Sequence, residues 1–338
     1  MPNTRMRLFA ATVLVALVAA ACGGDAGDRR LTVYSGRTEN LIGPLLERFT
    51  AQTGIEVEVR YGQSADLALL IDQEGDRSPA DVFISQSPGA VGYLAERGRL
   101  RPLDDGVLSL VPSEFRNEGG LWVGLTGRVR TLVYNRDLVD ESQLPGSVFD
   151  LTDERYRGAV AVAPANGSFQ DFVTAMRELE GDDATLAWLR GLADNGAPTY
   201  ANNTSIVQAV ARGDVPMGLV NHYYNIRAKA EDPTLPTENY FFPGGDIGSL
   251  LIVTAASIVD AGDQPEAATE LIRFLLSEDA QSFFAGKTFE YPLAAGVEPA
   301  SALPPLSSIE VATYDFDRLG GGLERTTSLI DASGLEAP

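Results

Sequence analysis

Two adjacent tyrosines, Tyr223 and Tyr224, could together hold a metal ion. They follow an apolar run at 217–221 that predicts a buried strand, and they begin a predicted helix. A hard, highly charged cation prefers anionic oxygen, and a bound metal can deprotonate a phenol whose ordinary pKa is ~10. Neighbours on a regular helix point ~100° apart, but the backbone at a strand-to-helix junction can aim both rings at one point. The alternative is one ring in the core and one at the surface.

Small or amide residues follow the other predicted strands as well. In open α/β sheets, ligands bind at the carboxyl ends of strands, where helix N-termini present unpaired N–H groups. The alternative for any single junction is a helix cap worth ~1 kcal/mol. The junctions read Gly36-Arg37-Thr38, Tyr61-Gly62, Ser85-Gln86-Ser87, Asn166-Gly167-Ser168, Asn202-Asn203-Thr204 and Asn221-His222-Tyr223-Tyr224.

The elements that must position these residues alternate between strand and helix, which predicts parallel βαβ units and an α/β fold. The predicted strands are 31–35, 55–61, 80–85, 122–126, 129–135, 159–164, 217–221 and 250–257. The predicted helices are 41–49 with Gly54 closing it, one capped by Ser64, 169–180, 183–195, 205–212, one from Tyr223, and 265–276. About 310 residues after an export signal exceed one ordinary core, so we expect two lobes.

The start of the chain reads as an export signal of a lipoprotein. Arg5 and Arg7 precede an apolar run at 8–21 that is shorter than the ~20 residues needed to span a bilayer. Small residues stand directly before Cys22, the one cysteine of the chain. We therefore expect a signal peptide at 1–21, a lipid on the Cys22 sulfur and no disulfide. The alternative is a buried core cysteine or a catalytic thiol.

Charge and composition exclude several classes of function. Without the two arginines of the signal, the 26 basic residues fall to 24 against 47 acidic ones, a net charge of −23. Such a surface repels nucleic acid and anionic lipid. One histidine and no nucleophile-elbow, P-loop or His-Glu-x-x-His pattern leave little for acid–base or nucleophilic chemistry, which disfavours an enzyme.

Five sequence words together resemble the ferric-binding periplasmic protein family, the iron(III)-binding proteins of ABC importers, from about residue 31 to 330. They are Val33–Arg37, Glu74–Phe83, Gly127–Arg130, Asn221–Tyr224 and Glu290–Leu293. The resemblance implies a two-lobed type II periplasmic-binding-protein architecture with two crossover hinge strands, near Arg130 and Thr254, and a ferric ion in the cleft. We expect a linker at 22–28, lobe 1 at 29–129 plus 255–304, and lobe 2 at 130–254 plus 305–338.

The same resemblance makes Tyr223 and Tyr224 ferric ligands, but this chain departs from the family elsewhere. Thr38 stands where many relatives have a histidine ligand, and Gln86 stands where some have a glutamate. Neither side chain is a good ferric ligand, so both are weak candidates. His222 stands where relatives usually have an amide, which favours a supporting or surface role over coordination.

Two residues at expected cleft-facing loops could replace the lost ligand. Glu39 and Tyr61 both carry oxygen and both lie near the carboxyl ends of predicted strands. The alternative for Tyr61 is an aromatic that merely closes its strand.

Related members complete the site with carbonate or phosphate, and this chain has groups suited to such an anion. Arg128 and Arg130 lie two positions apart and share one face of a regular strand, and the family match favours Arg128. An arginine near a hinge is alternatively a salt-bridge partner. The expected anion ligands are Arg128, the helix start Asn166-Gly167-Ser168, and the amides of Asn203 and Asn221.

These inferences predict a monomeric, lipid-anchored binding protein outside the cytoplasmic membrane, at the cell surface or in a periplasm. It would pass ferric iron to the permease and ATPase of an ABC importer. The alternative is the same fold binding an oxyanion, such as an organophosphonate or a phosphorylated sugar, without metal.

Overall fold

The computed structural model describes residues 30–86, 88–294, 296–312, 314 and 322–335. The predicted signal peptide, the linker with Cys22, and Ser87 lie outside these residues. The strands are β1 Arg30–Ser35, β2 Glu56–Tyr61, β3 Val82–Ser85, β4 Leu100–Arg101, β5 Val123–Asn135, β6 Val160–Ala161, β7 Met217–Asn221, β8 Thr237–Tyr240, β9 Leu251–Val259 and β10 Tyr291–Pro292. The α-helices are α1 Glu39–Thr53, α2 Ser64–Glu74, α3 Pro88–Glu96, α4 Asp105–Leu108, α5 Gly167–Glu180, α6 Asp182–Asp194, α7 Asn203–Arg212, α8 His222–Glu231, α9 Pro265–Leu275, α10 Glu278–Phe283 and α11 Leu323–Ser333.

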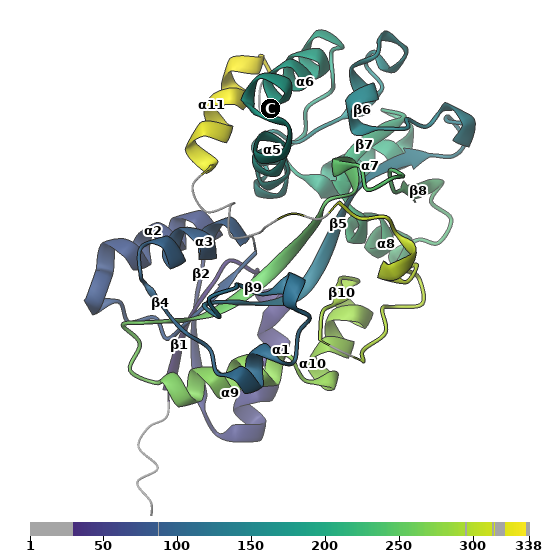
Figure 1. Cartoon of the computed structure of the whole chain (residues 1–338). Helices are drawn as coiled ribbons and strands as arrows, with labels where there is room; N and C mark the ends of the chain where they lie inside the picture. Colours follow the sequence, from purple (N-terminus) through teal and green to yellow (C-terminus); the bar gives the residue numbers. More distant parts are fainter. Residues whose placement is uncertain (1–29, 87, 295, 313, 315–321, 336–338) are drawn as a thin grey trace, which may run out of the picture.

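The first half of the sheet carries the N-terminal helices (Figure 1). Its strand order is β2-β1-β3-β9-β5, with β1 parallel to β2 and β3 and with β9 antiparallel to β3 and β5. Helix α1 buries its apolar stripe, and its Phe49 ring packs against Phe274 of α9 at 5.5 Å between centroids. The helix ends at Gly54, whose φ of 74° is the left-handed conformation that glycine adopts at low cost.

The second half of the sheet carries strands β7, β6 and β8. Strand β7 pairs antiparallel with β5 and parallel with β6, and β8 adds antiparallel to β5. Helices α5, α6 and α11 lie together at the far end of this half (Figure 1). An aromatic cluster of Phe169, Phe172 and Trp188 joins α5 to α6, with ring centroids 5.8 to 6.4 Å apart.

Strands β5 and β9 run between the two halves (Figure 1). Strand β5 pairs with β9 up to Val129 and with β7 from Arg130 onward, and all of its residues are buried. The prediction of two separate strands here was wrong. Gly127 lies inside the strand, and a Cβ on it would come within 2.9 Å of Leu251 Cδ1. This glycine permits close packing rather than a turn.

The α/β fold and most predicted elements are confirmed, with ends usually shifted by one or two residues. The prediction that Ser64 caps α2 was wrong: the N-cap is Gln63, and Ser64 Oγ accepts the main-chain N–H of Gln86 at 2.9 Å. Among the described residues, no helix has the length and apolarity needed to cross a membrane.

Candidate metal centre

Tyr223 and Tyr224 occupy the first turn of α8, directly after the buried strand β7. Their rings stack with centroids 4.3 Å apart and an angle of 27° between the planes. The Tyr223 ring is buried and the Tyr224 ring is half-buried, and the two hydroxyl groups interact. The two rings therefore lie side by side rather than one in the core and one at the surface.

The surroundings of Tyr223 favour the protonated form of its phenol. Burial raises the pKa of this phenol well above 10, the neighbouring Tyr224 raises it further, and Arg128 acts in the opposite direction. At neutral pH the hydroxyl is protonated. A cation that binds its oxygen must release that proton, and the energy of the metal bond drives the release.

Arg130 lies beside the tyrosines, on β5 opposite Asn221 of β7. Its Nη1 donates to Asn221 Oδ1 at 3.2 Å and approaches Asn203 Oδ1 and Ser168 Oγ at 3.5 Å each. Asn203 Nδ2 in turn donates to Asn166 Oδ1 at 3.0 Å. The structure thus gathers the starts of α5, α7 and α8 around one guanidinium.

This cluster contains buried hydrogen-bond donors that have no protein partner among the described residues. These donors are Nε and Nη2 of Arg130 and Nδ2 of Asn221. Burial lowers the pKa of Arg130 to about 9, with Tyr224 opposing the shift, so the group is still charged at neutral pH. Buried donors without partners cost about 1–3 kcal/mol each, which an oxyanion in this position would recover.

The helix caps divide the predicted junctions into two kinds. The side chain of Asn166 accepts the N–H of Ser168 at 3.2 Å, and that of Asn202 accepts the N–H of Ser205 at 2.9 Å. These asparagines are ordinary caps, so the Ser168 N–H predicted to face an anion is already used. Asn221, by contrast, makes no side-chain cap and leaves the start of α8 to other partners.

Arg128 has different neighbours from Arg130. Its Nη2 donates to the main-chain carbonyl of Gln86, and its Nε is buried without a partner among the described residues. The group lies close enough to Tyr223 and Glu290 to influence the pKa of each. Arg128 therefore joins the loop after β3 to the tyrosines, whereas the amides predicted for the anion surround Arg130.

The candidate ligands from the first half lie at the amino end of α1 and the end of β2. Thr38 is the exposed N-cap of α1, and its hydroxyl donates to Asn40 Oδ1 at 2.6 Å. Glu39 is exposed in the first turn, and the Tyr61 hydroxyl lies nearby, since a Cβ on Gly43 would come within 3.6 Å of it. Burial raises the pKa of Tyr61, and so does the charge of Glu39.

Gln86 presents an amide with one free end. Its side-chain Oε1 is buried and has no partner among the described residues. Its main chain is held from both sides, because the N–H donates to Ser64 Oγ and the carbonyl accepts from Arg128.

His222 is fully buried and does not lie at the surface. The main-chain N–H of Val129 donates to Nδ1 at 3.1 Å, so Nε2 carries the proton and donates to the Phe289 carbonyl at 2.8 Å. Burial lowers the pKa of the imidazole to about 4. Both ring nitrogens are occupied, so His222 has no lone pair left for a metal ion.

The sequence analysis missed a buried ion pair between Arg37 and Glu290. Nη2 of Arg37 lies 2.6 Å from Glu290 Oε2, and Nη1 donates to Thr254 Oγ1 at 3.0 Å. The carboxylate also accepts the Thr288 hydroxyl at 2.8 Å. Arg37 and Glu290 both belong to motifs named in the sequence analysis. Their opposite charges were the feature from which an ion pair could have been predicted.

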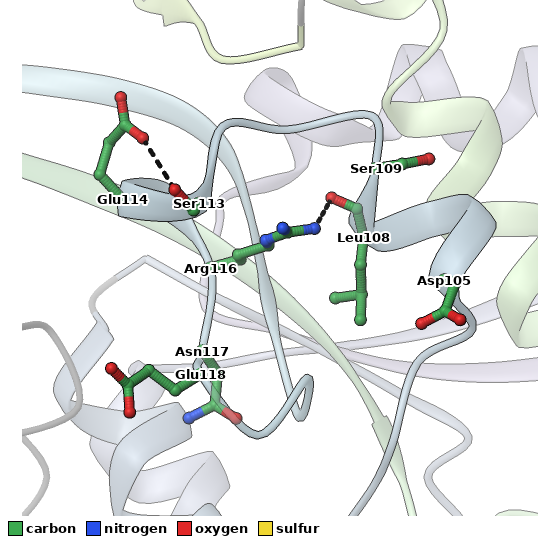
Figure 2. Close-up of a pocket in the computed structure, with 8 residues that line it drawn as sticks. All are labelled: Asp105, Leu108, Ser109, Ser113, Glu114, Arg116, Asn117 and Glu118. Atoms are coloured by element: carbon green, nitrogen blue, oxygen red, sulfur yellow. Dashed lines mark hydrogen bonds between the residues drawn. The ribbon is translucent and has the colours of Figure 1, made fainter.

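A surface pocket of about 850 Å³ lies elsewhere, beside α4 (Figure 2). Figure 2 shows the Arg116 guanidinium reaching the Leu108 carbonyl and the Ser113 hydroxyl bonded to Glu114. Its walls contain none of the predicted site residues, and these polar groups bond to one another or to main chain. The described residues also contain no cluster of three or more His, Cys, Asp or Glu side chains that could hold a metal ion.

Comparison with known proteins identifies the family. A sequence profile of bacterial extracellular solute-binding proteins matches residues 77–319. The chain belongs to this family. The solute-binding protein is 29% identical to the Fe(3+)-binding periplasmic protein of Serratia marcescens, over 97% of this chain and 96% of that one. It is 31% identical to iron uptake protein A1 of Synechocystis sp., over 91% and 88% of the two chains.

Solved structures place this solute-binding protein in the two-lobed type II fold, as predicted. Iron-bound HitA from Pseudomonas aeruginosa superimposes with a TM-score of 0.85 at 33% identity, over 90% of this chain and 99% of that one. A more distant relative at 23% identity, over 75% of this chain, is a putative 2-aminoethylphosphonate-binding periplasmic protein of Salmonella typhi. Membership of a solute-binding family agrees with the prediction that the protein is not an enzyme.

Proposed function

We propose that this solute-binding protein captures ferric iron outside the cytoplasmic membrane, with Tyr223 and Tyr224 as phenolate ligands. The observation that carries the proposal is the stacked tyrosine pair beside a buried arginine that has unused donors. The names of the relatives at about 30% identity point the same way. The test is a ferric titration, because iron held by phenolate oxygen absorbs visible light.

The proposed site also holds an oxyanion such as carbonate or phosphate. Two phenolates leave coordination positions on ferric ion open, and an anion can fill them when its own charge is met on the other side. The buried donors of Arg130 and Asn221 support this seat. Arg128 was the residue predicted from the sequence, and its partners make it a second candidate.

The alternative of a metal-free oxyanion binder rests on the same donors. The exposed position of Thr38 and the amide at Gln86 leave the first half without a strong ferric ligand at either place, which favours that alternative. The phosphonate-binding relative shares only 23% identity with this chain. A protein that takes up phosphate or a phosphonate, and stays colourless with ferric ion, would establish the alternative.

We further propose that residues 29–129 plus 255–304 and residues 130–254 plus 305–338 form lobes that close on the ion. Closure would bring Tyr61 or Glu39 to the metal, since both lie at the edge of the first half near Gly43.

Changing Tyr61 to Phe and Glu39 to Gln should each test this closure. The variant that removes the true ligand should bind ferric ion at least tenfold more weakly and lose it faster, because one of the bonds that hold the closed state is missing. The measurement is the dissociation rate into excess chelator. If both variants match the wild type, water or the anion fills that position and the idea is wrong.

Proteins of this family serve ABC importers, so a permease and its ATPase are the expected partners. We propose that lipid on Cys22 keeps a monomeric protein at the membrane. The support comes from the sequence alone, through the charged start, the short apolar run and the small residues before the cysteine.

Cys22→Ala should release the protein from the membrane fraction, because the lipid is the proposed anchor. Fractionation followed by mass spectrometry of the mature N-terminus checks this, and light scattering on the released protein checks the monomer. Unmodified Cys22 in the wild type would contradict the anchor, and a stable dimer would contradict the oligomeric state.

A further inference from the structure

One short segment, Thr288–Tyr291, contacts both sides of the proposed site. We propose that this segment is a clamp that positions the loop after β1 and the tyrosine-bearing start of α8 relative to each other. Arg37, Glu290 and His222 are then positioning residues that set ferric affinity without touching the ion. The inference about affinity rests on the proposed function, whereas the mechanical coupling does not.

The first arm of the clamp is the Arg37–Glu290 ion pair. Both side chains are buried, and two hydrogen bonds of 2.6 and 3.1 Å join guanidinium to carboxylate. Burial acts to raise the pKa of Glu290, but Arg37, Arg128 and the Thr288 hydroxyl together lower it by more, so the net shift is downward and the carboxylate stays ionised. Arg37 directly precedes Thr38 and Glu39, so its fixed side chain sets the place of that loop.

The loop itself is tightly held around Arg37. Ser35 Oγ accepts the Arg37 N–H at 3.1 Å and donates to the Arg37 carbonyl at 2.9 Å. A Cβ on Gly36 would come within 2.0 Å of Ser64 Oγ, so a larger residue there would displace the Ser64 side chain. The loop that presents Thr38 and Glu39 is therefore held at Arg37 through both its main chain and its side chain.

The second arm of the clamp is His222. Its Nε2–H donates to the carbonyl of Phe289, the residue before Glu290, and its Nδ1 accepts from Val129 on β5. The Tyr291 ring packs on the imidazole at 4.9 Å between centroids. His222 directly precedes Tyr223, so the segment also holds the start of α8.

The backbone between the two arms is strained. Phe289 has a φ of 56°, and no other non-glycine residue in the described part of the chain has a positive φ. Such a conformation is unfavourable for a residue with a Cβ and persists only where its surroundings enforce it. Here it lets the carbonyl of residue 289 and the side chain of residue 290 serve opposite sides of the site.

The test cuts one arm and observes the other. Arg37→Met combined with Glu290→Met removes the ion pair without leaving a buried charge, a change that is often nearly neutral for stability. His222→Phe removes both imidazole hydrogen bonds and keeps a ring against Tyr291. The control is Arg177→Met with Asp182→Met, which removes an ion pair of 2.9 Å between α5 and α6, together with the contact of Asp182 to Arg325 on α11.

Amide hydrogen exchange of the metal-free proteins gives the decisive readout. The Arg37/Glu290 variant should speed exchange at residues 222–225, and His222→Phe should speed exchange at residues 36–40, each at least tenfold. The control pair should change neither segment. If each substitution speeds exchange only in its own segment, the clamp is overturned. If His222→Phe does not fold, the Arg37/Glu290 variant alone is sufficient for the test.

Ferric affinity supplies the second readout. Both variants should bind iron at least tenfold more weakly than the control pair at equal folded fraction. Unchanged affinity would overturn the positioning role. If the wild-type protein binds no iron but the variants show the expected changes in exchange, the proposed function is refuted and the clamp is still supported.

Discussion

Replacing Tyr223 and Tyr224 together with phenylalanine should abolish ferric binding while leaving the fold almost intact. The wild-type protein should turn coloured as iron binds, through phenolate-to-metal charge transfer, and the double variant should stay colourless. Each single variant should lose more than tenfold in affinity, which corresponds to more than ~1.4 kcal/mol. The rings remain in place in every variant, so their packing in the first turn of α8 is preserved.

Tyr93→Phe is the matched control for this experiment. Its hydroxyl donates to Asp72 on the neighbouring helix α2 and belongs to none of the proposed ligand groups. It should bind iron as the wild type does. Tight, coloured iron binding in the Tyr223/Tyr224 double variant would show that the ligands lie elsewhere.

Changing Arg130 to Gln should remove most of the dependence of iron binding on bicarbonate or phosphate. The wild type should bind ferric ion at least tenfold more tightly with the anion present, because the anion fills open positions on the metal and the guanidinium offsets its charge. Linkage requires iron to tighten anion binding by the same factor. Titrations of both proteins with ferric ion, each with and without the anion, measure this coupling.

Arg128→Gln is the comparison that decides between the two arginines. Both are buried on the same strand, but only Arg130 lies among the amides of Asn203 and Asn221. The anion effect should survive in Arg128→Gln and vanish in Arg130→Gln. The reverse pattern would place the anion at Arg128, and equal affinities in all combinations would make the anion incidental.

Local sequence patterns were sufficient for most of the fold. Apolar periodicity located α1 and Gly54 located its end, because both depend on neighbours in the chain. The continuity of β5 could not be predicted, since Gly127 looks like a break unless the Leu251 side chain that packs on it is known. That contact joins residues more than a hundred positions apart.

Part of the candidate site could likewise be predicted from local sequence, and part could not. Strand-to-helix junctions could be predicted locally, and they placed Asn166, Asn203 and Asn221 near one another as observed. The choice between Arg128 and Arg130 could not be predicted locally, because strand periodicity puts both residues on one face. What separates them is a carbonyl at Gln86 for one and a set of amides for the other.

The burial of His222 could not be predicted from the sequence either. Its two ring nitrogens are satisfied by main-chain groups of Val129 and Phe289, which come from distant parts of the chain. An isolated histidine beside two tyrosines carries no local sign of either partner.

The place of β9 in the sheet has a consequence for how the chain becomes folded. This strand lies between β3 and β5, so the sheet of the first half lacks its middle until residue 259 is available. Pairings over such sequence separations fold slowly, because loop closure must precede the contacts that reward it. An exported chain that emerges amino end first therefore holds unpaired edges of β3 and β5 until β9 follows, more than a hundred residues later.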